Sequence, residues 1–243
     1  MSTNHSIFQG LSQKKSQVKS WLKRIIKPKI VDIKGVKIKL PKVASDTVRD
    51  VIHRGLYEAR ELDIVSRKLS HDDVVMEIGT GLGLLSSYCA QKIGSDKVFT
   101  FEANPNLEKA IIDNYTLNQV SPSLEMCLVG RQNGVRQFYV GDNFWSSSIF
   151  DKPQGAKPIS VPVISFNDKV REINPSFLLL DIEGGECELV QYAEFHNIQK
   201  MMIEIHDWIL STEQIDFVQQ TLIEKGFSMV EKSGEGEYYF ERQ

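Results

Sequence analysis

Five short apolar runs alternate with helical patterns through the 243-residue sequence, and this alternation constrains the fold more than any other feature. The runs cover residues 74–78, 98–101, 124–129, 177–180 and 201–205. Short apolar strands that alternate with helices form a parallel sheet whose two faces are covered by the helices. We therefore predict an α/β domain in which a ligand binds beyond the carboxyl ends of the strands.

Two features at the end of the chain complete the predicted sheet. Ser211 and Gln214 have the spacing of a capping box, which predicts the start of a helix. Two strands at 227–230 and 238–240 follow, and a turn over 233–236 joins them, so they must pair antiparallel. The predicted fold is a Rossmann-like, mostly parallel sheet with a C-terminal antiparallel hairpin.

The segment from 131 to 174 interrupts the alternation of strands and helices. It contains two predicted strands, at 137–140 and 160–164, on either side of a polar loop at 141–158. We consider two roles for this loop, which are a cover over the ligand site and a solvated surface loop.

The first 44 residues differ in charge from the rest of the chain. They contain ten Lys, one Arg and one acid, for a net charge of +10, whereas the whole chain has a net charge of -3. Apolar residues at helical spacing predict a basic amphipathic helix at 18–27, and an alternating pattern predicts a small hairpin at 31–40. The helix is expected to pack on the protein itself, with an anionic membrane surface as the alternative. We divide the chain into a basic arm over 1–44 and a sheet domain over 45–243.

The number and spacing of the cysteines indicate a reducing compartment. Cys89, Cys127 and Cys187 lie far apart and form no C-x-x-C pair, so neither a zinc site nor a disulfide framework is indicated. The sequence has no stretch of 18 apolar residues, and its first ten residues lack the apolar core of a secretory signal. We expect a cytoplasmic protein, membrane-associated only if the basic arm binds lipid.

Evenly spaced glycines follow the first apolar run. Gly79, Gly81 and Gly83 come directly after Glu77, and such glycines permit a tight turn and the close approach of a ligand. The pattern departs from the dinucleotide motif G-x-G-x-x-G because Leu84 stands at the third position, and Glu77 would repel a pyrophosphate. S-adenosylmethionine (SAM) has no phosphate and carries an ammonium group, which suits a carboxylate. The alternative is that Glu77 caps local backbone and the glycines only form a turn.

Cofactor-binding residues are also predicted after the second and third runs. Glu102 ends the second run, where a carboxylate can accept hydrogen bonds from both hydroxyls of a ribose. Ala103 and Asn104 follow it, and Val129 and Gly130 are placed beside an adenine ring. The alternative for Glu102 is an acid that faces a helix dipole.

Candidate catalytic residues follow the fourth and fifth runs. Asp181, Glu183 and Glu186 come after the fourth run, and His206 comes after the fifth. Burial and repulsion between carboxylates can raise one pKa and so create a base. We predict Asp181 as the catalytic base and His206 as its competitor, with a cofactor contact and a structural role as the alternatives. We assign no metal ligand, although Mg²⁺ accepts carboxylates of this kind.

Together these motifs resemble the FkbM family of SAM-dependent methyltransferases over residues 50–207. The resemblance lies in the motifs at 77–83, 101–105 and 181–186 and in Gly-Leu-Tyr-Glu at 55–58. It implies a class I methyltransferase fold, SAM as the cofactor and, as a rule, methylation of a hydroxyl oxygen.

The resemblance also implies roles for single residues. Glu77 and the three glycines would surround the methionine part of SAM, Glu102 would hold the ribose, and Asp181 would lie beside the methyl group. The chain departs from the family pattern at Leu179, where the family commonly has Lys.

The predicted function is methyl transfer from SAM to a hydroxyl oxygen of a small-molecule, glycan or lipid-linked acceptor. RNA methylation is an alternative, but nucleic acid is disfavoured because residues 45–243 are acidic and no Asn/Asp-Pro-Pro-Tyr/Phe signature follows the fourth run. An NAD-linked oxidoreductase is disfavoured by Glu77 and Leu84, and a non-enzymatic nucleotide-binding module is the remaining alternative. The acceptor, the oligomeric state and the role of the arm stay open.

Overall fold

A computed structural model describes residues 29–40, 46–140, 157–234 and 236–242. The predicted amphipathic helix at 18–27 and most of the predicted loop at 141–158 lie outside these residues.

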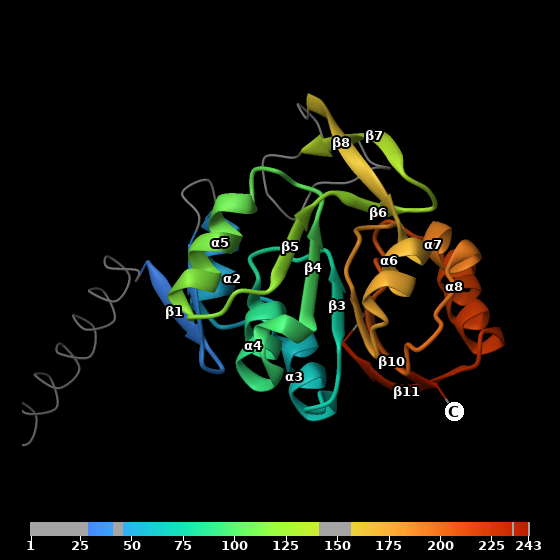
Figure 1. Ribbon diagram of the computed structural model, residues 1–243, viewed down its shortest axis with the longest axis horizontal. Helices are drawn as coiled ribbons and strands as arrows, with labels where there is room; N and C mark the ends of the chain where they lie inside the picture. The colour runs from blue at the N-terminus through green and yellow to red at the C-terminus, as the bar shows by residue number, and fades with distance from the viewer. Residues whose placement is uncertain (1–28, 41–45, 141–156, 235, 243) are drawn as a thin grey trace, which may run out of the picture.

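Seven strands form the central sheet: β3 (Val75–Ile78), β4 (Val98–Glu102), β5 (Ser123–Met126), β9 (Phe177–Leu180), β10 (Lys200–Glu204), β11 (Phe227–Ser233) and β12 (Glu237–Arg242). Their order across the sheet is β11-β12-β10-β9-β3-β4-β5 (Figure 1). Five neighbouring strands are parallel, and β12 runs antiparallel to β10 and β11. The structure thus confirms the predicted parallel sheet and its C-terminal antiparallel hairpin.

The order of the strands reverses at β3. From β3 the chain adds β4 and β5 on one side and, later, β9 and β10 on the other. Ile78, at the end of β3, pairs with Phe101 on one neighbour and Leu180 on the other. The strands therefore end at the same level, and Gly79, Glu102 and Asp181 leave the sheet at one edge.

Helices cover both faces of the sheet. On one face lie α2 (Asp46–His53), α3 (Ala59–Lys68), α4 (Leu84–Ile93) and α5 (Glu108–Leu117), and on the other lie α6 (Phe166–Ile173), α7 (Glu186–Tyr192) and α8 (Thr212–Glu224) (Figure 1). Alternate residues of β3 enter the two cores, since Val75 packs with the first group of helices and Met76 with the second. The predicted capping box starts α8, and a short 3-10 helix, η1 (Ser95–Lys97), precedes β4.

A second sheet of three strands occupies the segment that interrupts the alternation. It consists of β6 (Leu128–Gly130), β8 (Lys157–Ser165) and β7 (Gly134–Val140) in that order. The single run predicted at 124–129 is therefore wrong, because the chain leaves the central sheet after β5 and pairs again with β8. Helix α6 was not predicted, although Ser165 caps it by accepting a hydrogen bond from the Asp168 N–H.

The predicted N-terminal hairpin is present as β1 (Ile30–Ile33) and β2 (Val36–Lys39). Its two-residue turn, Lys34-Gly35, has positive φ at both positions, as twisted hairpins favour. Two amides of β2 donate hydrogen bonds to Asn114 and Asn118 of helix α5, each at 2.8 Å. Its apolar side chains, among them Ile38, are buried in the core that the first group of helices shares. The hairpin therefore packs on the sheet domain.

Among the helices described, none combines the length and the apolar character that a membrane span requires.

Candidate functional site

The carboxyl ends of β3, β4, β9 and β10 border a cavity of about 1000 Å³. Most of the predicted site residues line it: Gly79, Gly81, Glu102, Ala103, Val129, Gly130, Asp181 and His206. Glu77, Gly83 and Asn104 are not among the lining residues. The structure therefore brings the predicted cofactor residues and the predicted catalytic residues together around one space.

The glycine loop after β3 crosses the sheet edge in close contact with its neighbours. Gly79 has a φ of +88°, and a Cβ atom there would lie 1.7 Å from the carbonyl oxygen of Asp181. Its N–H donates a hydrogen bond of 2.9 Å to the Phe101 carbonyl. No residue with a side chain fits this position, so the loop is held flat against the ends of β4 and β9.

Gly83 serves packing between helices. Its φ is +77°, and a Cβ atom there would lie 2.7 Å from the ring of Tyr115 on α5. Gly83 thus lets the first turn of α4 approach α5, and it does so away from the cavity wall.

Glu102 is fixed in place by the backbone. One carboxyl oxygen accepts a hydrogen bond from the Gly81 N–H at 3.0 Å, and the other accepts one from the Asn104 N–H at 2.7 Å. Burial raises its pKa to about 7, although these backbone hydrogen bonds favour the charged form and lower it. Each oxygen of an ionised carboxylate can accept more than one hydrogen bond. Glu102 can therefore accept from the backbone and from a ligand at the same time.

Glu77 lies beneath the glycine loop and is only 2% exposed. Burial raises its pKa to about 8, and hydrogen bonds from Ser86 and Thr80 partly offset that effect. Its Oε2 atom has no hydrogen-bond partner within the described residues. Its position supports the loop from below, one layer behind the cavity.

The segment before β3 supplies wall residues that were not predicted as site residues. Tyr57 accepts a hydrogen bond from the Leu82 N–H at 3.1 Å and so ties this segment to the glycine loop. Glu58, beside it, has a φ of 46°, and burial raises its pKa well above the usual range. Both residues line the cavity together with Glu61. The only sequence signal for them was the Gly-Leu-Tyr-Glu motif at 55–58.

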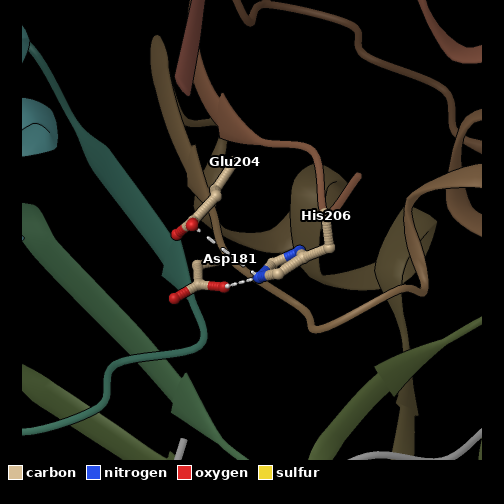
Figure 2. Close-up of side chains that lie close together, drawn as sticks. All are labelled: Asp181, Glu204 and His206. Carbon is tan, nitrogen blue, oxygen red and sulfur yellow. Dashed lines mark ion pairs between the residues drawn. The ribbon is translucent and has the colours of Figure 1, made fainter. Parts of the chain in front are cut away.

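Acidic side chains surround His206, which also lines the cavity. Its Nδ1 atom lies 2.7 Å from Oε1 of Glu186. Its Nε2 atom lies 3.4 Å from Asp181 Oδ1 and 3.9 Å from Glu204 Oε1 (Figure 2). The same atom lies 3.4 Å from Glu183 Oε2. Glu204 was not predicted as a site residue, because it ends a buried strand and no motif includes it.

The pKa values in this cluster reflect burial and the excess of carboxylates. Burial is the main cause that raises the pKa of Glu204 to about 9 and that of Glu183 to about 7. Burial and the charge of Glu183 hold the pKa of Asp181 well above its usual range. Burial lowers the pKa of His206, but the Glu186 hydrogen bond and the nearby carboxylates raise it by more, to about 10. The cluster therefore balances its negative charge by binding protons.

Arg136, Glu188 and Trp208 also line the cavity. Arg136 of β7 forms an ion pair of 3.2 Å with Glu188 of α7, so the second sheet and α7 meet across the cavity. Trp208 is 67% exposed, and its ring meets the His206 ring edge-on at 4.7 Å between centroids. An apolar surface is thus presented next to the acidic cluster.

The sheet order with a single reversed strand, the glycine loop at the switch point and the carboxylate after β4 define a class I methyltransferase. The model of the methyltransferase FkbM domain matches residues 73–229, which is more than half of the chain. The chain belongs to this family, and SAM is its cofactor.

Similar proteins were found by sequence and by structure. A putative protein N5-glutamine methyltransferase of Methanocaldococcus jannaschii is 35% identical over 98 residues, which are 39% of this chain and 43% of the relative. The chain thus spans less than half the length of that curated relative. A putative transferase of Pyrococcus horikoshii aligns with a TM-score of 0.48 at 13% identity, over 96% of this chain and 83% of that one. The ribosomal protein L11 methylase of Lactobacillus delbrueckii subsp. bulgaricus aligns with a TM-score of 0.47 at 14% identity, over 75% and 78%.

Proposed function

We propose that this methyltransferase transfers the methyl group of SAM to a hydroxyl oxygen of its acceptor, with Asp181 as the residue that acts on that hydroxyl. The observation that carries the proposal is the contact between the glycine loop and Asp181, whose backbone leaves no room for a side chain at Gly79. A cofactor on the loop and an acceptor at Asp181 would therefore be immediate neighbours.

The residues present fit SAM. Glu102 offers acceptor capacity for the ribose hydroxyls, and Gly79 and Gly81 leave the backbone bare where the methionine part would lie. Val129 and Gly130 would lie beside the adenine. Glu77 would act from beneath the loop, whereas Glu58 lies in the cavity wall where it can face the ammonium group. Asn104 would contribute through the N–H that orients Glu102.

When bound, SAM supplies a methyl group on a positively charged sulfur, and the methyl carbon bonds to the acceptor oxygen as its bond to sulfur breaks and the electron pair stays on sulfur. A hydroxyl oxygen is a poor nucleophile until it loses its proton. In this proposal the Asp181 carboxylate takes that proton, and His206 positions Asp181 from 3.4 Å away. The residues on the loop hold the two reactants in line.

A second candidate is transfer to the amide nitrogen of a protein glutamine. Its support is that the M. jannaschii relative is named as a putative protein N5-glutamine methyltransferase. The sequence after β9 reads Asp181-Ile182-Glu183-Gly184, without the Asn/Asp-Pro-Pro-Tyr/Phe signature of amino-group methylation. We therefore favour the oxygen, and propose a small-molecule, glycan or lipid-linked acceptor over RNA or protein.

Incubation of cell extract with the protein and SAM that carries an isotopically labelled methyl group tests the proposal. Mass spectrometry is expected to find the label on an oxygen, in a product that releases no labelled methylamine on acid hydrolysis. Label on N5-methylglutamine or on RNA would contradict it.

Substitution of Asp181 tests the role of this carboxylate. We expect Asp181→Asn to bind SAM as the unchanged protein does and to lose about 10²–10⁴-fold in kcat, since that is what a general base contributes. Asp113→Asn is the matched control, because Asp113 lies on α5, paired with Lys39 and outside the cavity wall. Turnover by Asp181→Asn at the control rate would remove Asp181 from this role.

A further inference from the structure

We propose that Asp181, Glu204 and His206 together bind one divalent metal cation at the acceptor end of the cavity. One donor atom from each residue lies within 4.8 Å of the others. Adjacent ligands of an octahedral ion with bonds of about 2.1 Å lie about 3.0 Å apart, and opposite ligands lie about 4.2 Å apart. The distances from His206 Nε2 to the two carboxylates, 3.4 and 3.9 Å, fall in this interval (Figure 2). Small movements would therefore complete the coordination.

The environment of His206 is that of a metal ligand. Its Nδ1 atom faces Oε1 of Glu186 at 2.7 Å, and Glu186 is fully buried. In the cation-bound form Nδ1 would donate its hydrogen to this carboxylate, and Nε2 would face the cation with its lone pair. Metal-ligating histidines almost always have such a carboxylate or carbonyl partner on their other nitrogen.

Asp181 supplies the second, independent observation. Its Oδ1 atom is buried and has no hydrogen-bond partner in the described part of the chain. The His206 side chain is only 2% exposed, and its Nε2 atom lies 3.4 Å from this oxygen. A buried oxygen without a partner is costly. A cation between the two atoms would bind both of them and give the buried oxygen a partner.

A neighbouring triad is a weaker candidate. Glu61, Glu204 and Glu237 also bring three oxygen atoms within 4.8 Å of one another. Glu237, however, already forms an ion pair of 3.0 Å with Arg60, so its charge is partly balanced.

The donor set of the proposed site indicates which ion it would bind. Two carboxylate oxygens and one imidazole nitrogen suit an ion such as Mn²⁺, which accepts both donor types.

The role of the cation, unlike its binding, rests on the proposed function. A cation lowers the pKa of a hydroxyl that it binds. Asp181 would then hold the cation through Oδ1, while its other carboxyl oxygen takes the hydroxyl proton as in the proposed function.

Titration of the full chain with Mn²⁺, followed by electron paramagnetic resonance in the absence of SAM and acceptor, tests the site. We expect one Mn²⁺ per chain. Glu204→Gln and His206→Gln should each lower the affinity by at least about tenfold, because changing a residue that only contacts a metal ligand already lowers affinity by about that much. Glu186→Gln, which alters the carboxylate that contacts both His206 and the Gly184 N–H, is expected to weaken binding by about 10–100-fold.

Glu188→Gln is the matched control. Glu188 is a carboxylate of the same cavity wall outside the triad, paired with Arg136, and its removal is expected to change Mn²⁺ affinity by no more than about twofold. No binding at millimolar Mn²⁺, or equal losses in Glu188→Gln and Glu204→Gln, would overturn the proposal. If thermal melting shows that His206→Gln is unfolded, the Glu204→Gln variant tests the proposal instead, because the Glu204 side chain is partly exposed. Mn²⁺ binding without methyl transfer would contradict the proposed function and leave the metal site intact.

Discussion

Glu102 shows how one side chain can be prepared for a ligand before the ligand arrives. Two backbone N–H groups fix its carboxylate, while burial raises its pKa to about 7. The ionised form accepts hydrogen bonds at both oxygens, whereas the protonated form must donate at one of them. The protonation state of Glu102 should therefore control how well it holds a ribose.

Adenosine binding is expected to depend on pH through this group. Because the raised pKa belongs to the free protein, affinity should fall as pH decreases through about 7, by up to about tenfold per pH unit, and should be constant above it. Glu102→Gln is the control, and it should bind weakly at all pH values. Calorimetric titration between pH 6 and 8 measures this, and a pH-dependent Glu102→Gln would contradict the assignment.

At the scale of elements, the register of the sheet places the site. Ile78 lies level with Phe101 and Leu180, and Ile203 of β10 lies level with Leu180. The turns after four strands therefore open into one cavity although they come from distant parts of the sequence. The β1–β2 hairpin strengthens the first of the two cores, because Ile38 is fully buried in it.

Truncation of a buried hairpin side chain is expected to destabilise the whole domain. Ile38→Ala should lower the free energy of unfolding by about 2–5 kcal/mol, because it removes a fully buried aliphatic side chain and leaves a cavity. Val135→Ala is the control, since Val135 is 72% exposed, and it should change stability by no more than about 0.5 kcal/mol. Denaturant unfolding measures both. Equal stability of the two variants would show that the hairpin does not contribute to the cooperative core.

At the scale of the molecule, the parallel sheet was predictable because its central strands are mostly apolar. All four residues of β3 and all four of β9 are buried, so the runs stand out in the sequence. Two strands of the second sheet, β7 and β8, were predicted at 137–140 and 160–164, but their pairing with β6 in a separate sheet was not, because β7 is largely exposed and β6 reads as part of the run at 124–129. Helix α6 could have been found from Ser165 and the spacing of Phe166 and Val170.

Some residues of the candidate site could be predicted from the sequence, and others could not. Gly79, Glu102 and Asp181 were predictable because each ends or directly follows a strand of the parallel sheet and belongs to a recognisable motif. Glu204 also ends a strand, but no motif includes it, and no rule of sequence spacing links Tyr57, in the segment before β3, to the ends of other strands. Glu77 lies behind the wall because side chains alternate between the two faces of a strand and its own points beneath the loop.

Calorimetric titration of the full chain with SAM and with NAD tests the central claim that SAM binds at the glycine loop between β3 and α4. We expect one SAM per chain, no measurable NAD binding, and a loss of SAM affinity of at least about tenfold in Glu102→Ala, since a hydrogen bond to a charged group contributes about 1.5–3 kcal/mol. Tighter binding of NAD than of SAM, or unchanged SAM affinity in Glu102→Ala, would contradict the account.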